Sequence, residues 1–526
     1  MHIHGEYCRV RKKYYNEDTG KWIGRILPSM TEERKSIRVY DFNIKYEDYF
    51  QISLIPRVKY FLTYVYRRMI DEERNEELWV YISSSFQRTI LSNSFLDIID
   101  VLEDIGCLLV TKRGSNPYDS RKKKVYFKLD DVYFDSVNTS SKVYSESLKR
   151  SLVNSYKKIV SPYEFLQYEV NVFKNHIGVL DHSYDSLFTK RIHRKQYEES
   201  GQYLWDTLSK SKYSQISNSI YKGEYIGWSD EKKSKYERGF KKRYKSLLDI
   251  LNEYDDISDL GSIRLDPFAG RVLNPIILKD REFRSFVSLD GEDTVEVDMS
   301  TGYASLLYVI SDSLSTGKMG NVDYGTLNKL IDKESNLPYF YLQDFLDVYK
   351  MCFGLDSIDF YHYVGIRIVN SLKSKGIFES DDFVLNIGKL IQDKPYRNYI
   401  KDLVIRLINS HPDHYTNIRF IGGHYTFREI SDIVLTEGVT DMLNHIKTTK
   451  IYKDKTRKLW SNSSKLIMEQ EVKVMREVQH SLMDSNIPYV SLHDGILVGR
   501  SRLPLVQSIV NSVVSKYRFV QFKYKL

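Results

Sequence analysis

The chain has 526 residues, of which 28% are charged, and its formal net charge at pH 7 is +8. This length exceeds what one hydrophobic core ordinarily organises, so we expect two or three domains. The modest basic excess suits a polyanionic partner but does not identify one. The three cysteines, Cys8, Cys107 and Cys352, form no CxxC pair, which argues against a disulfide framework or a cysteine-bound zinc ion and favours a reducing, cytoplasmic compartment. No apolar run approaches the roughly 20 residues of a membrane span, and the first fifteen residues, MHIHGEYCRVRKKYY, lack the apolar core of a signal peptide.

Residues 1–140 predict a small N-terminal α+β domain. Residues 94–105 read SFLDIIDVLEDI, with apolar residues at helical spacing, and Gly106 follows as a stop signal. The runs CLLVTKRG and KKKVYFKL then predict two strands on either side of a polar loop. A helix followed by a hairpin with a basic tip is typical of a winged helix, which places its helix in a DNA groove. A small packing domain with a solvated basic loop fits the same pattern.

Residues 141–262 are expected to be mostly helical and strongly basic. In the stretch DEKKSKYERGFKKRYKSLLDIL, the apolar residues Phe240, Tyr244 and Leu247 recur at helical spacing, which leaves the lysines and arginines on the opposite face. Such a face is either simply solvated or follows the phosphate backbone of a duplex.

A first candidate catalytic carboxylate lies at the end of a predicted strand. Asp290-Gly291 indicates a tight turn, and the run TVEVDMS alternates apolar and polar residues up to Asp298. The next run, TGYASLLYVIS, predicts a helix with Ser300 or Thr301 as its N-cap. An aspartate at the end of a strand, just before a turn into a helix, is placed to present its carboxylate to a metal ion.

A second carboxylate lies in a predicted β-hairpin, IPYVSLHDGILVGR. Its two apolar strands flank His493-Asp494-Gly495, and because Asp-Gly favours a type I′ turn, we expect Asp494 at an exposed tip. Two carboxylates on adjacent strand ends can bind two Mg²⁺ ions, with Mn²⁺ as a substitute, because these hard cations prefer anionic oxygen ligands. The helix expected before the hairpin, SSKLIMEQEVKVMREVQHSLMDSN, carries an apolar stripe that we interpret as core.

The order of these motifs resembles that of family A DNA polymerases and of phage-type single-subunit RNA polymerases, over roughly residues 264–526. As in those families, a Gly-Arg pair (Gly270-Arg271) precedes the first aspartate, Asp298-Met299-Ser300 matches the DxS motif, and His493-Asp494 matches the last motif. The resemblance implies an α+β right-hand fold. Residues 263–526 would then form the palm and fingers, with the fingers at roughly 310–460. The segment 141–262 would be a thumb-like region, preceded by the winged-helix-like domain.

The resemblance also implies roles for residues near the two aspartates. Asp298 and Asp494 would be the catalytic metal ligands, and Arg271, Arg284 and His493 would contact the primer-template. From the residues alone, the two arginines fit equally well as surface ion-pair partners of nearby acids, namely Asp266, Asp280 and Glu282. His493 fits equally well as a residue that only fills the turn.

Two further motifs concern the incoming nucleotide. In YRNYIKDLVIRLIN, Arg397 and Lys401 are four residues apart and share a helical face; by the resemblance both would bind the triphosphate, and Lys401 would protonate the leaving pyrophosphate. Here Ile405 replaces the aromatic residue that those families have next on this helix. Tyr303, five residues past Asp298, matches the position that faces the sugar, where a bulky side chain favours deoxynucleotides; packing beneath the helix is the other reading.

Together these motifs predict Mg²⁺-dependent, template-directed nucleotidyl transfer, most simply DNA synthesis in the replication of a mobile element, plasmid or phage. The expected partners are a primer-template and nucleoside triphosphates, for a monomer in a bacterial or phage-infected cytoplasm that accessory replication proteins could assist. The alternatives are an RNA polymerase or primase on the same fold and a non-enzymatic DNA-binding replication initiator. A metal phosphohydrolase built on His493-Asp494 would need more histidines at suitable spacing. The sequence has no GxxxxGK[ST] phosphate loop, and its first half has no DxE motif on a predicted strand with the further acids that an exonuclease needs.

Overall fold

The chain folds into two compact units in the computed structural model, and each is described by itself. Unit 1 comprises residues 1–113, 124–158 and 256–260, and unit 2 comprises residues 114–123, 159–255 and 261–526. The structure describes residues 14–16, 21–23, 36–72, 79–116, 119–137, 139–180, 184–192, 229–255, 258–266, 268–278, 281–300, 302–316, 341–353, 359–374, 394–409, 418–420, 423–425, 427–448, 462–517 and 520–525.

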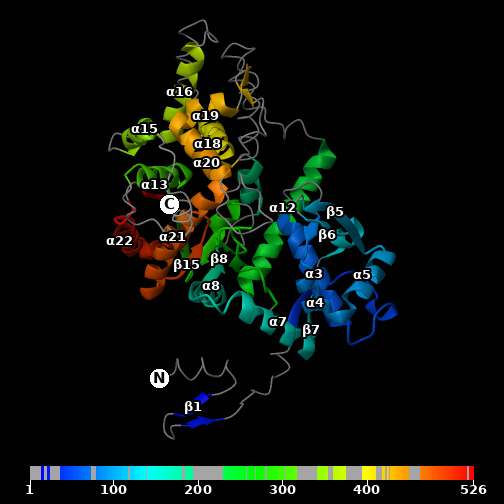
Figure 1. The fold of residues 1–526 in the computed structure, drawn as a ribbon. Helices are drawn as coiled ribbons and strands as arrows, with labels where there is room; N and C mark the ends of the chain where they lie inside the picture. Colours follow the sequence, from blue (N-terminus) through cyan, green and yellow to red (C-terminus); the bar gives the residue numbers. More distant parts are fainter. Residues whose placement is uncertain are drawn as a thin grey trace. The chain divides into compact units, whose positions relative to one another are not determined.

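Unit 1 contains small antiparallel sheets together with several helices, of which α3 (Ile55–Glu72) is the longest described (Figure 1). Its elements are β1 (Tyr14–Asn16), β2 (Lys21–Ile23), β3 (Ser36–Tyr40), α3 (Ile55–Glu72), β4 (Val80–Tyr81), α4 (Ser84–Leu91), α5 (Phe95–Asp104), β5 (Leu108–Asn116), β6 (Asp119–Leu129), α6 (Asp131–Ser136), β7 (Ser140–Tyr144) and α7 (Glu146–Ile159). Strand β3 pairs with β7, and β4, β6 and β5 form a three-stranded sheet. The buried carboxylate of Asp259 binds Arg38 at 2.9 Å and Arg67 at 2.8 Å.

The helix and two strands predicted for residues 94–129 are confirmed as α5, β5 and β6. Gly106 has φ +69°, a left-handed conformation that glycine adopts without strain and that ends a helix. The side chains of residues 112–124, which include the basic tip of the hairpin, lie outside the described part of the structure. Whether unit 1 is a winged helix therefore stays a prediction.

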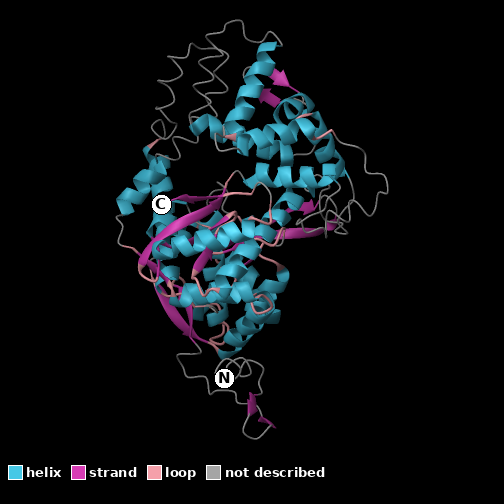
Figure 2. Ribbon diagram, turned by 90° about the vertical axis from the view of Figure 1, so that its left-hand side faces the viewer, coloured by secondary structure: helices cyan, strands magenta, loops and turns pink. Residues whose placement is uncertain are grey.

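Unit 2 contains a six-stranded antiparallel sheet and most of the helices of the chain (Figures 1 and 2). Its strands are β8 (Ile177–Val179), β9 (Arg264–Leu265), β10 (Val272–Leu273), β11 (Val287–Leu289), β12 (Glu292–Met299), β13 (Ile418–Phe420), β14 (Gly423–Tyr425), β15 (Tyr489–Ser491), β16 (Gly495–Gly499) and β17 (Phe522–Lys525). Its helices are α8 (Glu164–Asn175), α12 (Asp230–Asn252), α13 (Gly302–Thr316), α15 (Gln343–Phe353), α16 (Phe360–Ser374), α18 (Lys394–Asn409), α19 (Phe427–Leu435), α20 (Glu437–Thr448), α21 (Asn462–Asp484) and α22 (Leu503–Val514). Helices combined with antiparallel sheets make this an α+β protein, as the sequence predicts.

Strand β12 is central to the large sheet, whose order is β15-β16-β12-β11-β8. It pairs with β16 along one edge, and along the other it pairs with β11 near its start and with β17 near its end. The alternation expected for this strand is present, because Val295, Val297 and Met299 are buried while Glu296 and Asp298 lie on the more open face. The predicted Asp290-Gly291 turn is confirmed: both residues have positive φ, 53° and 80°, and join β11 to β12.

The helices bury their apolar faces against this sheet and against one another. Helix α8 packs on β15 and α21, and α22 packs on α21 and β16. A second group, α15, α16, α18, α19 and α20, continues the same core from α13 and α21, and Figure 1 shows α16, α18, α19 and α20 together. Helix α21 therefore links the sheet to the outer helices, since it contacts α13, α18 and α20 as well.

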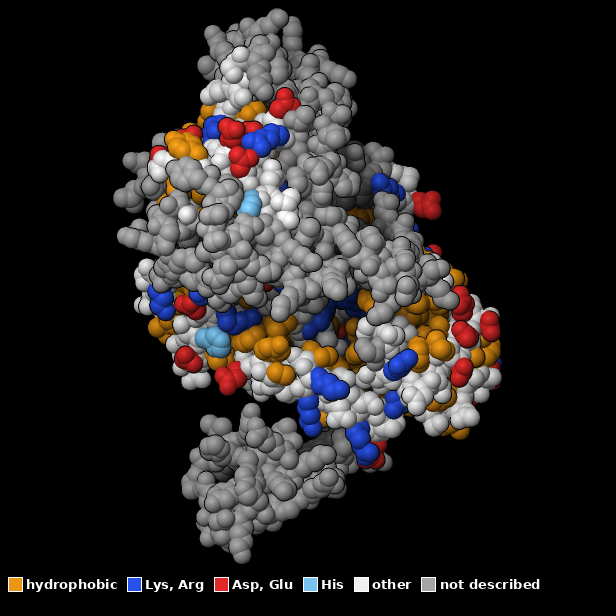
Figure 3. Space-filling view, viewed as in Figure 1, with side chains coloured by type: hydrophobic (Ala, Val, Ile, Leu, Met, Phe, Trp, Pro, Cys, Tyr) orange, Lys and Arg blue, Asp and Glu red, His pale blue; other side chains and the backbone are white. Residues whose placement is uncertain are grey.

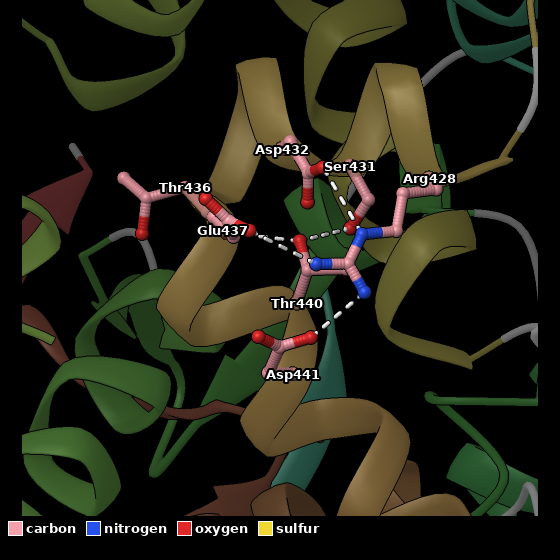
Figure 4. A network of polar contacts seen from close by, with 7 residues as sticks. All are labelled: Arg428, Ser431, Asp432, Thr436, Glu437, Thr440 and Asp441. Atoms are coloured by element: carbon pink, nitrogen blue, oxygen red, sulfur yellow. Dashed lines mark hydrogen bonds and ion pairs between the residues drawn. The ribbon is translucent and has the colours of Figure 1, made fainter. Parts of the chain in front are cut away.

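A polar network fixes the corner between α19 and α20 (Figure 4). Arg428 binds three acids, Asp432 at 3.2 Å, Asp441 at 2.8 Å and Glu437 at 3.4 Å. Beneath it, the buried hydroxyls of Ser431 and Thr440 are 2.8 Å apart. The Arg428 side chain is 48% exposed, so water screens these ion pairs and each contributes little to the stability of the corner.

The surface charges, the apolar length of the helices and the cysteines complete the description of the fold. On the face drawn in Figure 3, both basic and acidic side chains of the described residues are visible among apolar and uncharged ones. Within the described ranges, no helix is both long enough and apolar enough to span a bilayer. Cys107 and Cys352 are buried free thiols, and Cys8 lies outside the described residues.

Candidate active site

The two predicted carboxylates lie next to each other where two strands pair, Asp298 on β12 and Asp494 in the turn just before β16. In the antiparallel register of β12 and β16, Asp298 is directly opposite Gly495, and the backbone N–H of Met299 donates to the carbonyl oxygen of Asp494 at 2.7 Å. Residues 196 positions apart in the sequence (494 − 298) are thus neighbours in space. Charge repulsion between the two carboxylates is one cause of the raised pKa of Asp298.

The predicted type I′ turn at Asp494-Gly495 is wrong. Three residues, 492–494, separate the paired strands, and neither Asp494 nor Gly495 has the positive φ that this turn requires. Gly495 is instead the first residue of β16, where a Cβ atom would lie 2.4 Å from the carbonyl oxygen of Val297 and 3.0 Å from the Cα of Asp298. This glycine therefore permits a close approach of the two strands at the candidate site rather than a turn.

Asp494 is half-buried and not at an exposed tip. A Cβ atom placed on Gly302, the first residue of α13, would lie 3.9 Å from its Oδ2 atom. The carboxylate thus lies at the N-terminus of a 15-residue helix, where unpaired backbone N–H groups favour an anion. Thr301, one of the two predicted N-caps, lies outside the described residues, and the carbonyl of Ser300 accepts a hydrogen bond from the Ser305 hydroxyl.

Asp298 is surrounded by charges from the neighbouring strand β17. Burial, together with the charges of Asp494 and Glu296, raises the pKa of Asp298 to about 6, although Lys525 acts in the opposite direction. Lys525 donates to Oδ2 of Asp298 and, at 2.7 Å, to Oε1 of Glu296. The predicted primer-template residue Arg284 binds the same Glu296 at 3.2 Å.

Arg271 is paired with an acid that lies 200 positions away. It donates to Oε2 of Glu471 on α21 at 2.5 Å, and Tyr303 lies within hydrogen-bonding reach of Arg271 and of Asn409. The loop that carries Arg271 is shaped by Asp266, whose carboxylate accepts from the backbone N–H groups of residues 268 and 269. The local ion pairs considered for Arg271 and Arg284 are therefore not the ones the structure forms: Arg271 pairs with Glu471, and Arg284 with Glu296.

The positive charge near the buried carboxylate of Glu471 is too small to keep this group ionised at neutral pH. Burial raises its pKa to about 8; Arg271 opposes this shift, and Asp494 and Asp298 add to it. Among the described residues, its buried Oε1 atom has no hydrogen-bond partner. The carboxylates at this end of the sheet are thus undercompensated.

His493 has an exposed side chain at the turn, but protein atoms crowd its ring. This desolvation and the positive charge of Arg271 lower the pKa of the imidazole, so the ring is neutral at pH 7. A neutral imidazole can both donate and accept a hydrogen bond.

A buried polar network connects strand β15 of the hairpin to helices α8 and α21. Glu169 on α8 accepts from the Ser491 backbone N–H at 3.1 Å, from the Ser491 hydroxyl at 2.6 Å and from Asn274 at 2.6 Å. Gln479 donates to the same Ser491 hydroxyl at 2.9 Å, and Arg476 donates to Gln479 at 2.8 Å. Ser491, three residues before Asp494, is therefore fixed through its backbone N–H and its hydroxyl group by Glu169 and Gln479.

The predicted nucleotide-binding pair lies on α18, as expected. Arg397 binds Asp359 at 2.7 Å and lies over the ring of Tyr361, 5.1 Å from its centroid. The same Asp359 begins α16 by accepting the backbone N–H groups of Tyr361 and His362. Lys401 is half-buried one turn further along α18. Burial raises the pKa of Tyr361, and the charges of Asp359 and Asp494 add to this effect, whereas Arg397 opposes it.

The donor set fits divalent cations that are held jointly with a substrate. Within the described ranges, no three Asp, Glu, His or Cys side chains converge as a metal site. Mg²⁺, however, is commonly bound by one or two carboxylates, with substrate phosphates and water as the remaining ligands. Two adjacent aspartates and the raised pKa of Asp298 indicate negative charge that a divalent cation would balance.

Three residues of this region were not anticipated from the sequence. Glu471 lies on α21, a helix whose apolar stripe predicts core packing, and an acid beside that stripe is the sequence signal that could have marked it. Glu169 lies on the mixed polar and apolar helix α8 and is fully buried between Leu166 and Val170, which the same criterion would have marked. Lys525 lies on a strand of alternating Lys and aromatic residues, FKYK, and no local pattern indicates its partner.

The comparisons with known proteins add little to this geometry. No protein-family model matches the chain, and no curated protein matches its sequence. Among solved structures, the POL domain of Pol1 from M. smegmatis, in complex with DNA primer-template and dNTP, matches over 72% of this chain and 73% of that chain, with 12% sequence identity and a TM-score of 0.24. A TM-score this low does not establish a common fold.

Proposed function

We propose that the chain is a template-directed nucleotidyl transferase that synthesises DNA with Asp298 and Asp494 as its metal ligands. The observation that carries the proposal is the register of β12 and β16, which brings these two aspartates together at the end of paired strands. Gly495 is opposite Asp298 and directly follows Asp494. The backbone of β12 leaves no room for a side chain at Gly495, so the two strands lie close together at this point. Two Mg²⁺ ions bound there would activate a primer 3′-hydroxyl and neutralise the triphosphate.

The surrounding residues have roles that follow from their charge and position. Arg397 and Lys401, on one face of α18, would bind the triphosphate, with Lys401 as the proton donor to pyrophosphate. A triphosphate would compete with Asp359 for the Arg397 guanidinium, since both are anionic oxygen ligands. Tyr303, at the start of α13, would exclude a 2′-hydroxyl.

The primer-template would lie along the basic residues near the turn. Arg271, Arg284 and His493 are close enough to interact electrostatically, since both arginines lower the pKa of the histidine. Phosphate contacts of this kind position a duplex without reading its sequence. Replication of a plasmid, mobile element or phage, with or without accessory proteins, is the biological setting that such an enzyme would serve.

Primer extension by the full chain tests the proposal. We would offer dNTPs and NTPs separately, on DNA and RNA templates, with Mg²⁺ or Mn²⁺. Asp298→Asn and Asp494→Asn preserve side-chain shape and remove the anionic ligand, and each should reduce extension at least a hundredfold. Asp293→Asn is the matched control: Asp293 is an exposed acid on the same strand, 3.7 Å from Arg500, and its replacement should leave extension unchanged.

The outcomes separate the alternatives. Extension with NTPs in preference to dNTPs would identify an RNA polymerase or primase. A chain that binds DNA but extends no primer, in wild type and variants alike, would be a replication initiator without catalytic activity, and the proposal would be wrong. Equal extension by wild type and Asp494→Asn would also refute the assignment of the metal ligands.

Variants of Tyr303 test the sugar preference separately. Tyr303→Ala removes the ring and should increase incorporation of ribonucleotides, whereas Tyr303→Phe keeps the ring and loses only the hydroxyl near Arg271 and Asn409. If Phe and Ala relax the preference equally, the hydroxyl network rather than steric bulk determines it.

A further inference from the structure

Lys525 makes a contact that the proposed chemistry does not require. Its ammonium group donates to Oδ2 of Asp298, an oxygen that a catalytic metal would need. We propose that Lys525 is a built-in counter-ion of Asp298, which a divalent cation must displace, and that this side chain thereby sets the metal affinity of the site. The inference rests on the proposed function, because it takes Asp298 as a metal ligand.

The register of β12 and β17 shows that the contact is specific. Lys525 is directly opposite Glu296, and Lys523 is directly opposite Asp298. Yet Lys523 is exposed, and the ammonium on Asp298 comes from Lys525, one diagonal position away. Lys525 therefore bridges two carboxylates on the same face of β12, rather than simply facing its nearest neighbour.

The strand that carries Lys525 is fixed to the core. Phe522 and Tyr524, which alternate with the two lysines, pack against the hydrophobic core of unit 2. Four residue pairs join β17 to β12, from Glu296 to Met299. The Cα of Lys525 is thus held in place, and only its side chain is able to leave Asp298.

The Lys525 side chain has a second carboxylate partner, Glu296, that remains available when the contact with Asp298 is broken. It keeps Glu296 at 2.7 Å when it leaves Asp298, and it is 39% exposed, so its ammonium also has access to water. A metal ion bound to Asp298 repels the ammonium, and the doubly charged cation is the stronger ligand for the carboxylate. The resting contact and the metal-bound state are therefore mutually exclusive at the same oxygen atom.

Metal binding to the full chain, without nucleotide or nucleic acid, measures the competition. Titration with Mn²⁺ by electron paramagnetic resonance at pH 8 would compare wild type with Lys525→Gln, Lys525→Arg and Lys523→Gln. An exposed ion pair contributes at most about 1 kcal/mol, so Lys525→Gln should tighten binding by roughly three- to fivefold. Lys525→Arg keeps the charge and should bind like wild type. Lys523→Gln removes the same charge from the same strand and should change affinity by less than twofold.

If Lys523→Gln and Lys525→Gln tighten Mn²⁺ binding equally, the inference is wrong, because the loss of one positive charge near the site, and not the loss of the contact with Asp298, would then explain the higher affinity. Weaker or unchanged binding in Lys525→Gln would also overturn it. Thermal unfolding without metal shows whether each variant is folded. If wild type and Lys525→Gln bind no Mn²⁺ at all, the inference fails, whereas the proposed function is decided separately by primer extension, because there the nucleotide supplies further metal ligands. If Asp298→Asn abolishes binding that Lys525→Gln leaves unchanged, only the inference fails.

A measurement on the wild-type chain needs no variant. Acetic anhydride acetylates the deprotonated amine of lysine, so an ammonium group held by a carboxylate reacts more slowly than one that is released into water. Mass spectrometry quantifies the modification at Lys525 relative to Lys523. Modification of Lys525 should rise at least twofold when Mg²⁺ is added, because the side chain is released from Asp298, while Lys523 should change little. An unchanged ratio under saturating metal would refute the displacement.

Discussion

Replacing Gly495 with alanine would place a methyl group between the two strands that carry the candidate site. Its Cβ would lie 2.4 Å from the carbonyl oxygen of Val297, whereas real Cβ atoms essentially never approach a heavy atom within 3.0 Å. Both neighbours of the methyl group, the Val297 carbonyl and the Asp298 Cα, are backbone atoms that cannot rotate away. The strands must therefore separate by at least the difference, about 0.6 Å, which follows from those two distances.

The magnitude follows from two opposing terms. Overpacking of this kind destabilises a protein by about 1–3 kcal/mol. Replacing a glycine inside a strand normally stabilises by roughly 0.5–1 kcal/mol, because the unfolded chain loses conformational freedom. We therefore expect Gly495→Ala to lower the free energy of unfolding by about 1–2 kcal/mol. Because a misplacement of about 1 Å at a catalytic centre can reduce rate about a hundredfold, we expect primer extension to fall by roughly 10- to 100-fold.

Gly499→Ala, on the same strand, is the matched control. Its Cβ would also meet an atom at 2.4 Å, but that atom is Oε1 of Glu292, at the far end of a flexible side chain. Moving it weakens only the exposed hydrogen bonds to Ser501, so we expect a loss below about 1 kcal/mol and unchanged extension. Urea unfolding and primer extension would compare the variants. If Gly495→Ala matches Gly499→Ala in both assays, the close approach of the strands is not what positions the site.

Three further variants test the surroundings. Glu169→Ala leaves the buried donors of Ser491 without an acceptor and should lower the free energy of unfolding by about 2–4 kcal/mol in urea, whereas Glu169→Gln keeps an acceptor and should lose less; equal losses would contradict this. Burial raises the pKa of Glu471 to about 8 from 4.5, so the stabilisation from its bound proton is present below pH 4.5 and is lost as pH rises through 8. The metal-free protein should lose about 1–2 kcal/mol between pH 6.5 and 8, and Glu471→Gln should flatten this slope; an unchanged slope would show that another group titrates. Gly438→Ala would place a Cβ 1.6 Å from the Tyr341 carbonyl oxygen, so its melting temperature should fall despite the better helix propensity of alanine, and a rise would show that α15 can move aside.

Local features of this protein could be predicted because their causes are local. The strand that ends near Asp298 follows from its alternating apolar residues. The Asp290-Gly291 turn follows from two residue types that tolerate positive φ. The helix that carries Arg397 and Lys401 follows from apolar residues at helical spacing. The same local reasoning failed at Asp494-Gly495, because a glycine required for close packing and one required for a turn look alike in a sequence.

The sequence by itself determined the strand, the hairpin and the helix that carry Asp298, Asp494 and Arg397, the α+β class, and the two acidic positions on which the proposed chemistry depends. Only the tertiary structure decided which groups meet: Asp298 with Gly495 and Lys525, and Arg271 with Glu471. These partners depend on strand register and on helix packing between segments up to about two hundred residues apart, which the period of one segment does not encode. The undercompensated charge near Asp298 likewise arises only when burial and distant carboxylates coincide, so it belongs to the folded state alone.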